Sequence, residues 1–191
     1  MALALRDLGD ITDATDPLLP KVIPAPAYVS RSASASGSTI VRRSSPSQPD
    51  ILREQWRAWW SRTLVRETRP AGTQLKPPHF SLFDRELELQ DLVSDHFAGA
   101  MAWTEERHDE YTRLSAAKHD QRVADIVEVV HQREHELRRQ AAYFRLDINI
   151  LPFARPGAWI VAPHTVVVSS SFRHDSRAFR EWFAPLVAAL V

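Results

Sequence analysis

The sequence predicts a mainly α-helical protein with a small α+β part at its C-terminal end. Three observations predict this fold class. The stretch 81–145 contains no proline and a single glycine, Gly99. An earlier stretch, 48–68, combines a helix-start signal with closely spaced tryptophans. After Arg145 the apolar residues change from helical spacing to alternation, which is typical of a half-buried strand.

Residues 1–47 are predicted to form a flexible or extended arm. Prolines interrupt the first half of this segment, and serines dominate the second half. Such a composition cannot bury enough apolar surface to offset the conformational entropy lost on ordering. The alternative is an arm that lies extended on a partner. Two apolar pairs would then occupy shallow pockets of that partner, Leu18 with Leu19 and Val22 with Ile23.

A helix is predicted over residues 48–68, and a linker over residues 69–80. Ser47 provides an N-cap hydroxyl, while Pro49 and Asp50 suit the first turn of the helix. The linker includes three prolines, which are typical of turns and irregular segments.

The predicted helix over residues 48–68 contains Trp56, Trp59 and Trp60 between several arginines. In one interpretation its tryptophan face packs on the long helix, and its arginines meet the acidic residues of 84–95. In the other, the tryptophans and arginines form a surface for a protein partner or for single-stranded nucleic acid.

The stretch 81–145 is predicted to be one long helical segment, with Gly99 or Thr104 as the point where it would break. In its second half the apolar residues alternate in steps of four and three, interrupted only at Glu134. About three heptads of such a seam indicate packing of one helix on another. The residues of the seam are Val123, Val127, Val130, Leu137, Ala141 and Phe144.

Length adds a constraint on this helical segment. Roughly 65 helical residues would span roughly 95 Å at ~1.5 Å per residue. A compact chain of 191 residues has a radius of gyration of only about 16 Å. The segment must therefore either fold back or bury its seam against another chain. Because no turn sequence interrupts it, we expect a long helix in an oligomer or a larger assembly.

Residues 146–191 are predicted to form a two- to three-stranded antiparallel hairpin or meander, followed by a helix. The first strand is indicated by the alternating Leu146, Ile148 and Ile150, and two further apolar runs follow it.

The predicted C-terminal helix has a clear start. Asp175 or Ser176 can cap its first turn, because short polar side chains accept hydrogen bonds from the first backbone N–H groups. Pro185 is expected to kink this helix or to end its regular part.

Composition excludes several functions. Cysteine is absent, so disulfides and thiolate chemistry are impossible, and only histidine and carboxylates could hold zinc. The 24 basic and 24 acidic residues cancel, and the sign of the charge alternates between positive 51–78, negative 79–110 and positive 111–145. Such a balance is a poor match to a general nucleic-acid-binding protein, which normally has a dominant basic face.

Signals for export and membrane insertion are not found in the sequence. The first residues lack the apolar core of a signal peptide, and no apolar stretch approaches the ~20 residues of a membrane span. We therefore expect a protein of the cytoplasm or of a soluble assembly.

One short motif suggests metal chemistry. Residues 131–135 match the pattern H-x-x-E-H through His131, Glu134 and His135. These five residues resemble the motif of the inverted zincin metallopeptidases. The resemblance implies zinc bound by His131 and His135, with Glu134 as general base. The alternative interpretation is the solvated polar face of a helix.

From these observations we predict a non-enzymatic structural or assembly subunit of a larger complex, such as a virion, a secretion or injection apparatus, or a scaffold. It would act through its long helix and its N-terminal arm, without a cofactor, on other protein subunits, whether copies of itself or different chains. The alternatives are a small zinc-dependent hydrolase and a nucleic-acid accessory protein. The predicted interaction residues are Trp56, Trp59, Trp60, Val123, Val127, Val130 and Leu137.

Overall fold

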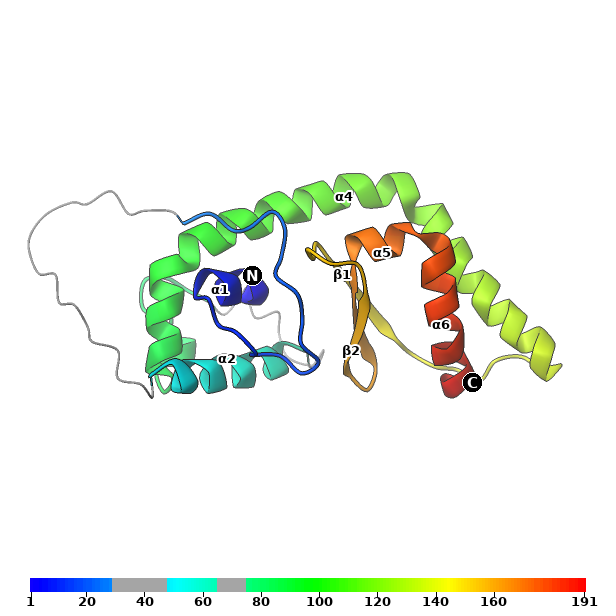
Figure 1. Cartoon of the computed structure of the whole chain (residues 1–191), viewed down its shortest axis with the longest axis horizontal. Coiled ribbons are helices and arrows are strands. Elements are labelled where there is room, and N and C mark those ends of the chain that lie inside the picture. The colour runs from blue at the N-terminus through cyan, green and yellow to red at the C-terminus, as the bar shows by residue number, and fades with distance from the viewer. Residues whose placement is uncertain (29–47, 65–74) are drawn as a thin grey trace, which may run out of the picture. The chain divides into compact units, whose positions relative to one another are not determined.

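The computed structural model describes residues 1–28, 48–64 and 75–191 (Figure 1). The chain forms two compact units, Met1–Glu106 (unit 1) and Arg107–Val191 (unit 2). The longest helix, α4 (Leu87–Leu137), contributes its first part to unit 1 and the rest to unit 2. The prediction of a mainly α-helical chain with a small α+β part is confirmed.

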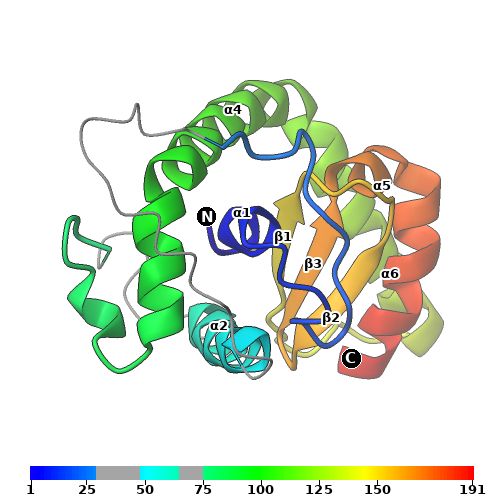
Figure 2. The same ribbon diagram turned by 60° about the vertical axis from the view of Figure 1, so that its left-hand side comes forward.

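Unit 1 consists of helices α1 (Ala2–Leu8) and α2 (Gln48–Leu64), the short 3₁₀ helix η1 (Ser81–Phe83) and the first part of α4. Figures 1 and 2 both show α1 beside α2 and the first turns of α4. The leucines of α1 are buried, as are Leu19 and Val22 from the loop that follows it.

The arm predicted over residues 1–47 is wrong for its first part, because residues 2–8 are helical and packed. The buried Arg6 guanidinium donates to the backbone oxygens of Leu19 and Pro20, and the Asp7 carboxylate accepts from the Val22 N–H. Side chains of α1 thus satisfy the backbone groups of a proline-rich loop, which propensity alone does not reveal. Residues 29–47 of the predicted arm lie outside the described residues.

Helix α2 follows the first of the two interpretations of the tryptophan-rich helix in part. Trp56 is fully buried, and Trp59 packs edge-on against Phe83 with ring centroids 5.3 Å apart. Arg62 meets the acidic segment through Glu86, whereas Arg53 and Arg57 donate to loop carbonyls of residues 12–14. Residues 65–74, which include the predicted end of this helix and the first half of the linker, lie outside the described residues.

Helix α4 is continuous through Gly99 and Thr104, so neither residue breaks it. It ends at Leu137, however, and the helix predicted as far as Arg145 is too long. Arg138 adopts a left-handed conformation (φ 52°), which ends the α-helix. The sequence has arginine and not glycine at this position, so it does not indicate that the helix ends here.

The chain turns back after α4, and the apolar residues that follow the turn pack on the core of unit 2. Phe144 and Leu146 pack against the core cluster formed by Val129, Phe179, Phe183 and Val187. The seam residue Phe144 is therefore part of the irregular segment between α4 and β1 and not of the helix.

The sheet of unit 2 has three strands in the order β1-β3-β2. β1 (Asp147–Leu151) pairs parallel with β3 (Thr165–Ser169), and β2 (Ala158–Ala162) pairs antiparallel with β3. The predicted antiparallel meander is correct for β2 and β3 and wrong for β1. All five residues of β3 are buried, and the strand with the most continuous apolar run takes the central place.

Two helices complete unit 2, α5 (Ser170–His174) and α6 (Ser176–Leu190). The Asp175 carboxylate accepts a hydrogen bond from the Ala178 N–H, as predicted for the cap of α6. Pro185 lies inside α6, which continues to Leu190. Of the two predicted effects of this proline, an end of the helix is wrong, and a kink stays a prediction. Among the described residues, no helix has an apolar stretch long enough to cross a membrane.

Candidate functional site

In unit 2, one face of α4 is committed to the core. Val129 is buried against Phe179, Phe183 and Val187 of α6, and Ile126 and Val130 pack at the margin of this cluster. The aromatic rings of α6 stack on one another, with centroids of Phe179 and Phe183 5.3 Å apart. This face is therefore closed to any partner while unit 2 is folded.

The adjacent face of α4 is apolar and exposed. Val123 and Val127 are 44% and 41% exposed, and Val130 is half-buried at the border with the core. At about 100° per residue, these three side chains lie within roughly 60° of one another around the helix. We name Val123, Val127 and Val130 the valine stripe.

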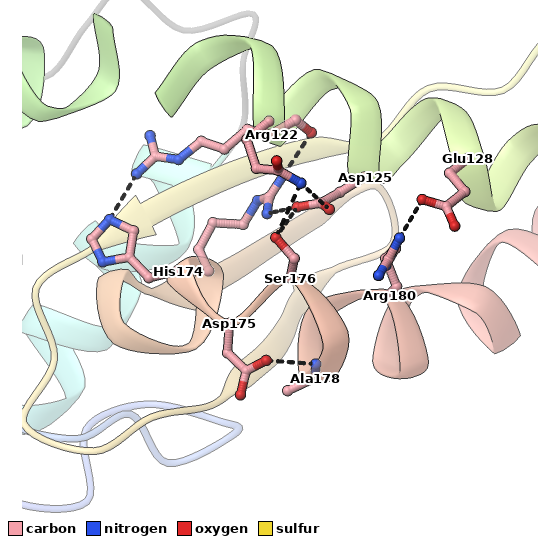
Figure 3. Close-up of polar contacts among 10 residues, drawn as sticks. Arg122, Asp125, Glu128, His174, Asp175, Ser176, Ala178 and Arg180 are labelled. Carbon is pink, nitrogen blue, oxygen red and sulfur yellow. Dashed lines mark hydrogen bonds and ion pairs between the residues drawn. The ribbon is translucent and has the colours of Figure 1, made fainter. Parts of the chain in front are cut away.

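A buried ion pair fixes the face of α4 that α5 and α6 cover (Figure 3). The Arg173 guanidinium donates to the Asp125 carboxylate over 2.7 Å, with side chains only 2% and 1% exposed. Arg173 also donates to the backbone oxygen of Arg122, 2.7 Å away, and lies over the Phe179 ring at 3.8 Å from its centroid. Arg173 of α5 thus contacts both α4 and α6.

Asp125 has further hydrogen-bond donors besides Arg173. The Ser176 hydroxyl lies 3.0 Å from one carboxylate oxygen, and the Gln121 amide lies 3.2 Å from the other. Burial alone would raise the pKa of Asp125, but the hydrogen bonds from Arg173, Ser176 and Gln121 outweigh it and hold this pKa below its usual value. Asp125 is therefore ionised at neutral pH. Its hydrogen bonds to Arg173 and Ser176 hold the Asp125 face of α4 against α5 and α6, and they thereby determine which face of α4 is exposed to solvent.

Arg122, one turn earlier, has neutral partners. Its guanidinium donates to the Ser115 hydroxyl at 3.2 Å and approaches the Tyr111 hydroxyl at 3.5 Å. Its second terminal nitrogen lies 3.3 Å from Nε2 of His174 (Figure 3). Because the guanidinium can only donate, this contact requires a neutral His174 whose Nε2 accepts.

The surroundings of His174 favour that neutral form. His174 is exposed as a residue, but partial burial of its imidazole lowers the pKa, and the nearby cations of Lys118, Arg122 and Arg173 lower it further. We name Lys118, Arg122, Arg173 and His174 the basic cluster; Lys118 and His174 are exposed, whereas Arg122 and Arg173 are buried.

The other predicted site residues are dispersed. Trp56 and Trp59 are buried in the core of unit 1, and Trp60 is half-buried and stacked on Trp56. Trp56 and Trp59 were predicted to be interaction residues, but this prediction is wrong because both rings are packed in the core. Leu137 is half-buried at the last residue of α4.

The H-x-x-E-H motif lies in the last turns of α4. His131 and His135 are exposed, whereas the Glu134 carboxylate accepts a hydrogen bond of 2.8 Å from the Ala141 N–H beyond the helix. In the parts of the chain that the structure describes, no three His, Asp or Glu side chains converge as metal ligands would. Glu134 thus has a structural partner in the turn that follows α4.

Comparisons with known proteins give no match: neither a family model, nor a curated protein, nor a solved structure is similar to this chain. The geometry and chemistry of the described residues are therefore the basis of the proposals below.

Sequence reasoning found the valine stripe but missed the basic cluster and the ion pair. A signal for them did exist. Arg122 and Asp125 share a helical face with Ile126 and Val129, and charged residues on an apolar face need buried partners. The partner, Arg173, is 48 residues further along the chain, and sequence spacing alone could not identify it.

Proposed function

We propose that this protein is a non-enzymatic structural subunit that associates with other protein subunits through the valine stripe of α4. The supporting observation is the exposure of Val123 and Val127, at 44% and 41%, directly beside a face that the core already occupies. Apolar surface gains roughly 25 cal/mol for each Å² removed from water, so a continuous stripe favours burial against a partner.

The simplest partner is a second copy of the chain. Its formal net charge is zero at pH 7, so two copies do not repel each other through their overall charge, and a net charge near zero promotes association. The four- and three-residue steps of the stripe match the spacing with which helices pack side by side.

The ion pair of Asp125 and Arg173 supports this proposal from the other side of α4. It holds α5 and α6 on the core face of the helix. The valine stripe therefore lies on a helix whose opposite contacts are fixed by the core of unit 2. A pre-organised surface loses less conformational freedom on binding.

The two alternative functions have weaker geometric support. A hydrolase would need Glu134 as a base, yet its carboxylate is engaged by the Ala141 N–H. Base stacking on α2 would need open tryptophan rings, yet Trp56 and Trp59 are buried.

The double substitution Val123→Glu with Val127→Glu should abolish self-association. Four carboxylates would have to be buried in a pairing of two copies, and their desolvation opposes association. We expect light scattering coupled to size-exclusion chromatography to give an oligomeric mass for the unmodified protein and a monomeric mass for the variant.

The matched control is Leu114→Glu. Leu114 is 47% exposed on the same helix, but its position is about 180° from Val123 at 100° per residue. The control should keep the oligomeric mass. A monomeric mass for the unmodified protein at every concentration, or equal loss of mass in both variants, would contradict the proposal.

A further inference from the structure

We propose that Lys118, Arg122 and His174 form a binding site for a phosphoryl oxyanion, either inorganic phosphate or the phosphate group of a phosphorylated side chain. The site lies where the end of α5 meets α4 in unit 2, and it is separate from the valine stripe. It extends beyond the proposed assembly role, which does not depend on it.

The first observation is a buried cation without a buried counter-charge. Arg122 is only 9% exposed, and its contacts are the hydroxyls of Ser115 and Tyr111, the Tyr111 ring and the imidazole of His174. Buried charges in proteins are normally paired. Within the described residues, no carboxylate forms a salt bridge with this guanidinium, because Asp125 is taken up by Arg173.

The second observation is an unused donor. Nε of Arg122 is buried and has no hydrogen-bond partner among the described residues. Arg107 and Arg133 share this feature, but each has a carboxylate partner, Glu110 and Glu136 respectively. Because Nε itself is buried, an oxyanion from solution would contact the terminal nitrogen of Arg122 that faces His174, and it would neutralise the charge.

The third observation concerns the groups around His174. Lys118 and Arg122 of α4 and Arg173 of α5 all lower the pKa of His174 through their positive charge, and Arg122 contacts its ring. The acidic residue nearest in sequence is Asp175, whose carboxylate is used to cap α6 at the Ala178 N–H (Figure 3). The imidazole is exposed, so a ligand from solution can reach the cluster at this edge.

A bound phosphate would reverse the electrostatics at His174. The free cluster favours the neutral imidazole, whereas a nearby anion favours the protonated one. The protonated ring can no longer accept from Arg122, but its Nε2–H can donate to a phosphate oxygen. Arg122 would then turn its terminal N–H groups to the anion. By linkage, bound phosphate should raise the pKa of His174.

The test is a titration of the full chain with inorganic phosphate at constant ionic strength, followed by NMR signals of the histidine rings. We expect saturable shifts of the His174 ring protons, with a Kd on the order of 1 mM, as for a weak small-anion site. The pKa of His174 should rise with phosphate. The exposed His131 and His135 are internal references, and their signals should not saturate.

Two variants distinguish this site from general attraction of anions. Arg122→Gln should weaken binding by roughly tenfold, the loss of one charge-assisted contact of about 1.4 kcal/mol. Because Arg122 is buried and this variant could lose its fold, Lys118→Ala provides a second test at an exposed position, with an expected weakening of roughly threefold. Lys21→Ala in unit 1 is the matched control and should bind as the unmodified protein does.

A parallel titration with O-phosphoserine identifies the source of the ligand. Tighter binding than to inorganic phosphate would assign the site to a phosphorylated side chain, and weaker binding would assign it to the free ion. Shifts that grow linearly with phosphate, or a Kd unchanged in both Lys118→Ala and a folded Arg122→Gln, would overturn the proposal.

Discussion

Replacing Asp125 by alanine should lower the free energy of unfolding of unit 2 by about 3–5 kcal/mol, because the Arg173 guanidinium would be left buried without its counter-charge. The two side chains are only 1% and 2% exposed, so water cannot replace the lost carboxylate. The Ser176 hydroxyl and the Gln121 amide would lose their acceptor as well. Native-state hydrogen exchange of the amides in Arg107–Val191 measures this loss.

The matched control replaces both members of the pair, as Asp125→Leu with Arg173→Met. Exchange of a buried ion pair for apolar residues of similar volume is often neutral or stabilising, so this variant should lose much less stability than Asp125→Ala. A loss below about 1 kcal/mol for Asp125→Ala would be typical of an exposed pair and would contradict the buried geometry.

Acid should reduce the effect of the Asp125 substitution. The folded-state pKa of this carboxyl lies below its unfolded value, so its stabilisation is fully present above the unfolded pKa of about 3.9. The stabilisation is lost as the pH falls through the lower, folded-state pKa. The difference in stability between the unmodified protein and the variant should therefore be constant between about pH 5 and about pH 7, because this range lies above the unfolded pKa of about 3.9. The difference should shrink in stronger acid.

Replacing Trp56 by alanine should destabilise unit 1 by about 3–5 kcal/mol, the usual cost of removing a large buried aromatic side chain. Trp56 is completely buried, its ring stacks on Trp60, and its indole N–H donates to the Ala2 oxygen over 3.1 Å. The substitution would leave a cavity between α1 and α2 and remove the hydrogen bond from the indole to the Ala2 oxygen. Hydrogen exchange of the amides in Met1–Glu106 should show the loss.

Trp60→Ala is the control for this prediction, since it removes the same side chain from the same helix at a half-buried position. Its cost should be clearly smaller. If Trp60→Ala were the more damaging change, or if Trp56→Ala left the exchange of α1 amides unaltered, the packing of α1 on α2 would be wrong.

The elements that were predictable from the sequence are those with a local signal. The central helix was predictable because no proline or turn sequence interrupts its middle, and the Asp175 cap because a short carboxylate precedes an amphipathic segment. Helix α1 was missed because its three buried leucines, Leu3, Leu5 and Leu8, are too few to indicate a core. They are buried because segments distant in the sequence, α2 among them, pack around α1.

The errors in unit 2 have the same origin. The end of α4 depends on a left-handed Arg138, a conformation that arginine has no local reason to adopt. The parallel pairing of β1 follows from the central position of β3, which the order of strands along the chain does not determine. Of the candidate site, the stripe was visible as a periodicity, whereas Arg173 and His174 reach Asp125 and Arg122 only through the fold.

The central claim is that a second subunit covers the valine stripe, and the reactivity of engineered thiols tests it most directly. The chain has no cysteine, so Val127→Cys and Leu114→Cys each introduce a single thiol at similarly exposed positions, 41% and 47%. Alkylation rates measured over a range of protein concentrations report whether each position is covered.

We predict equal rates for the two thiols in dilute solution and slower alkylation of the thiol at position 127 as the concentration rises, while the rate at position 114 stays constant. Equal rates at every concentration would contradict coverage of the stripe by a second copy. Protection of position 127 that does not depend on concentration would also contradict it, because the cover would then belong to the same chain.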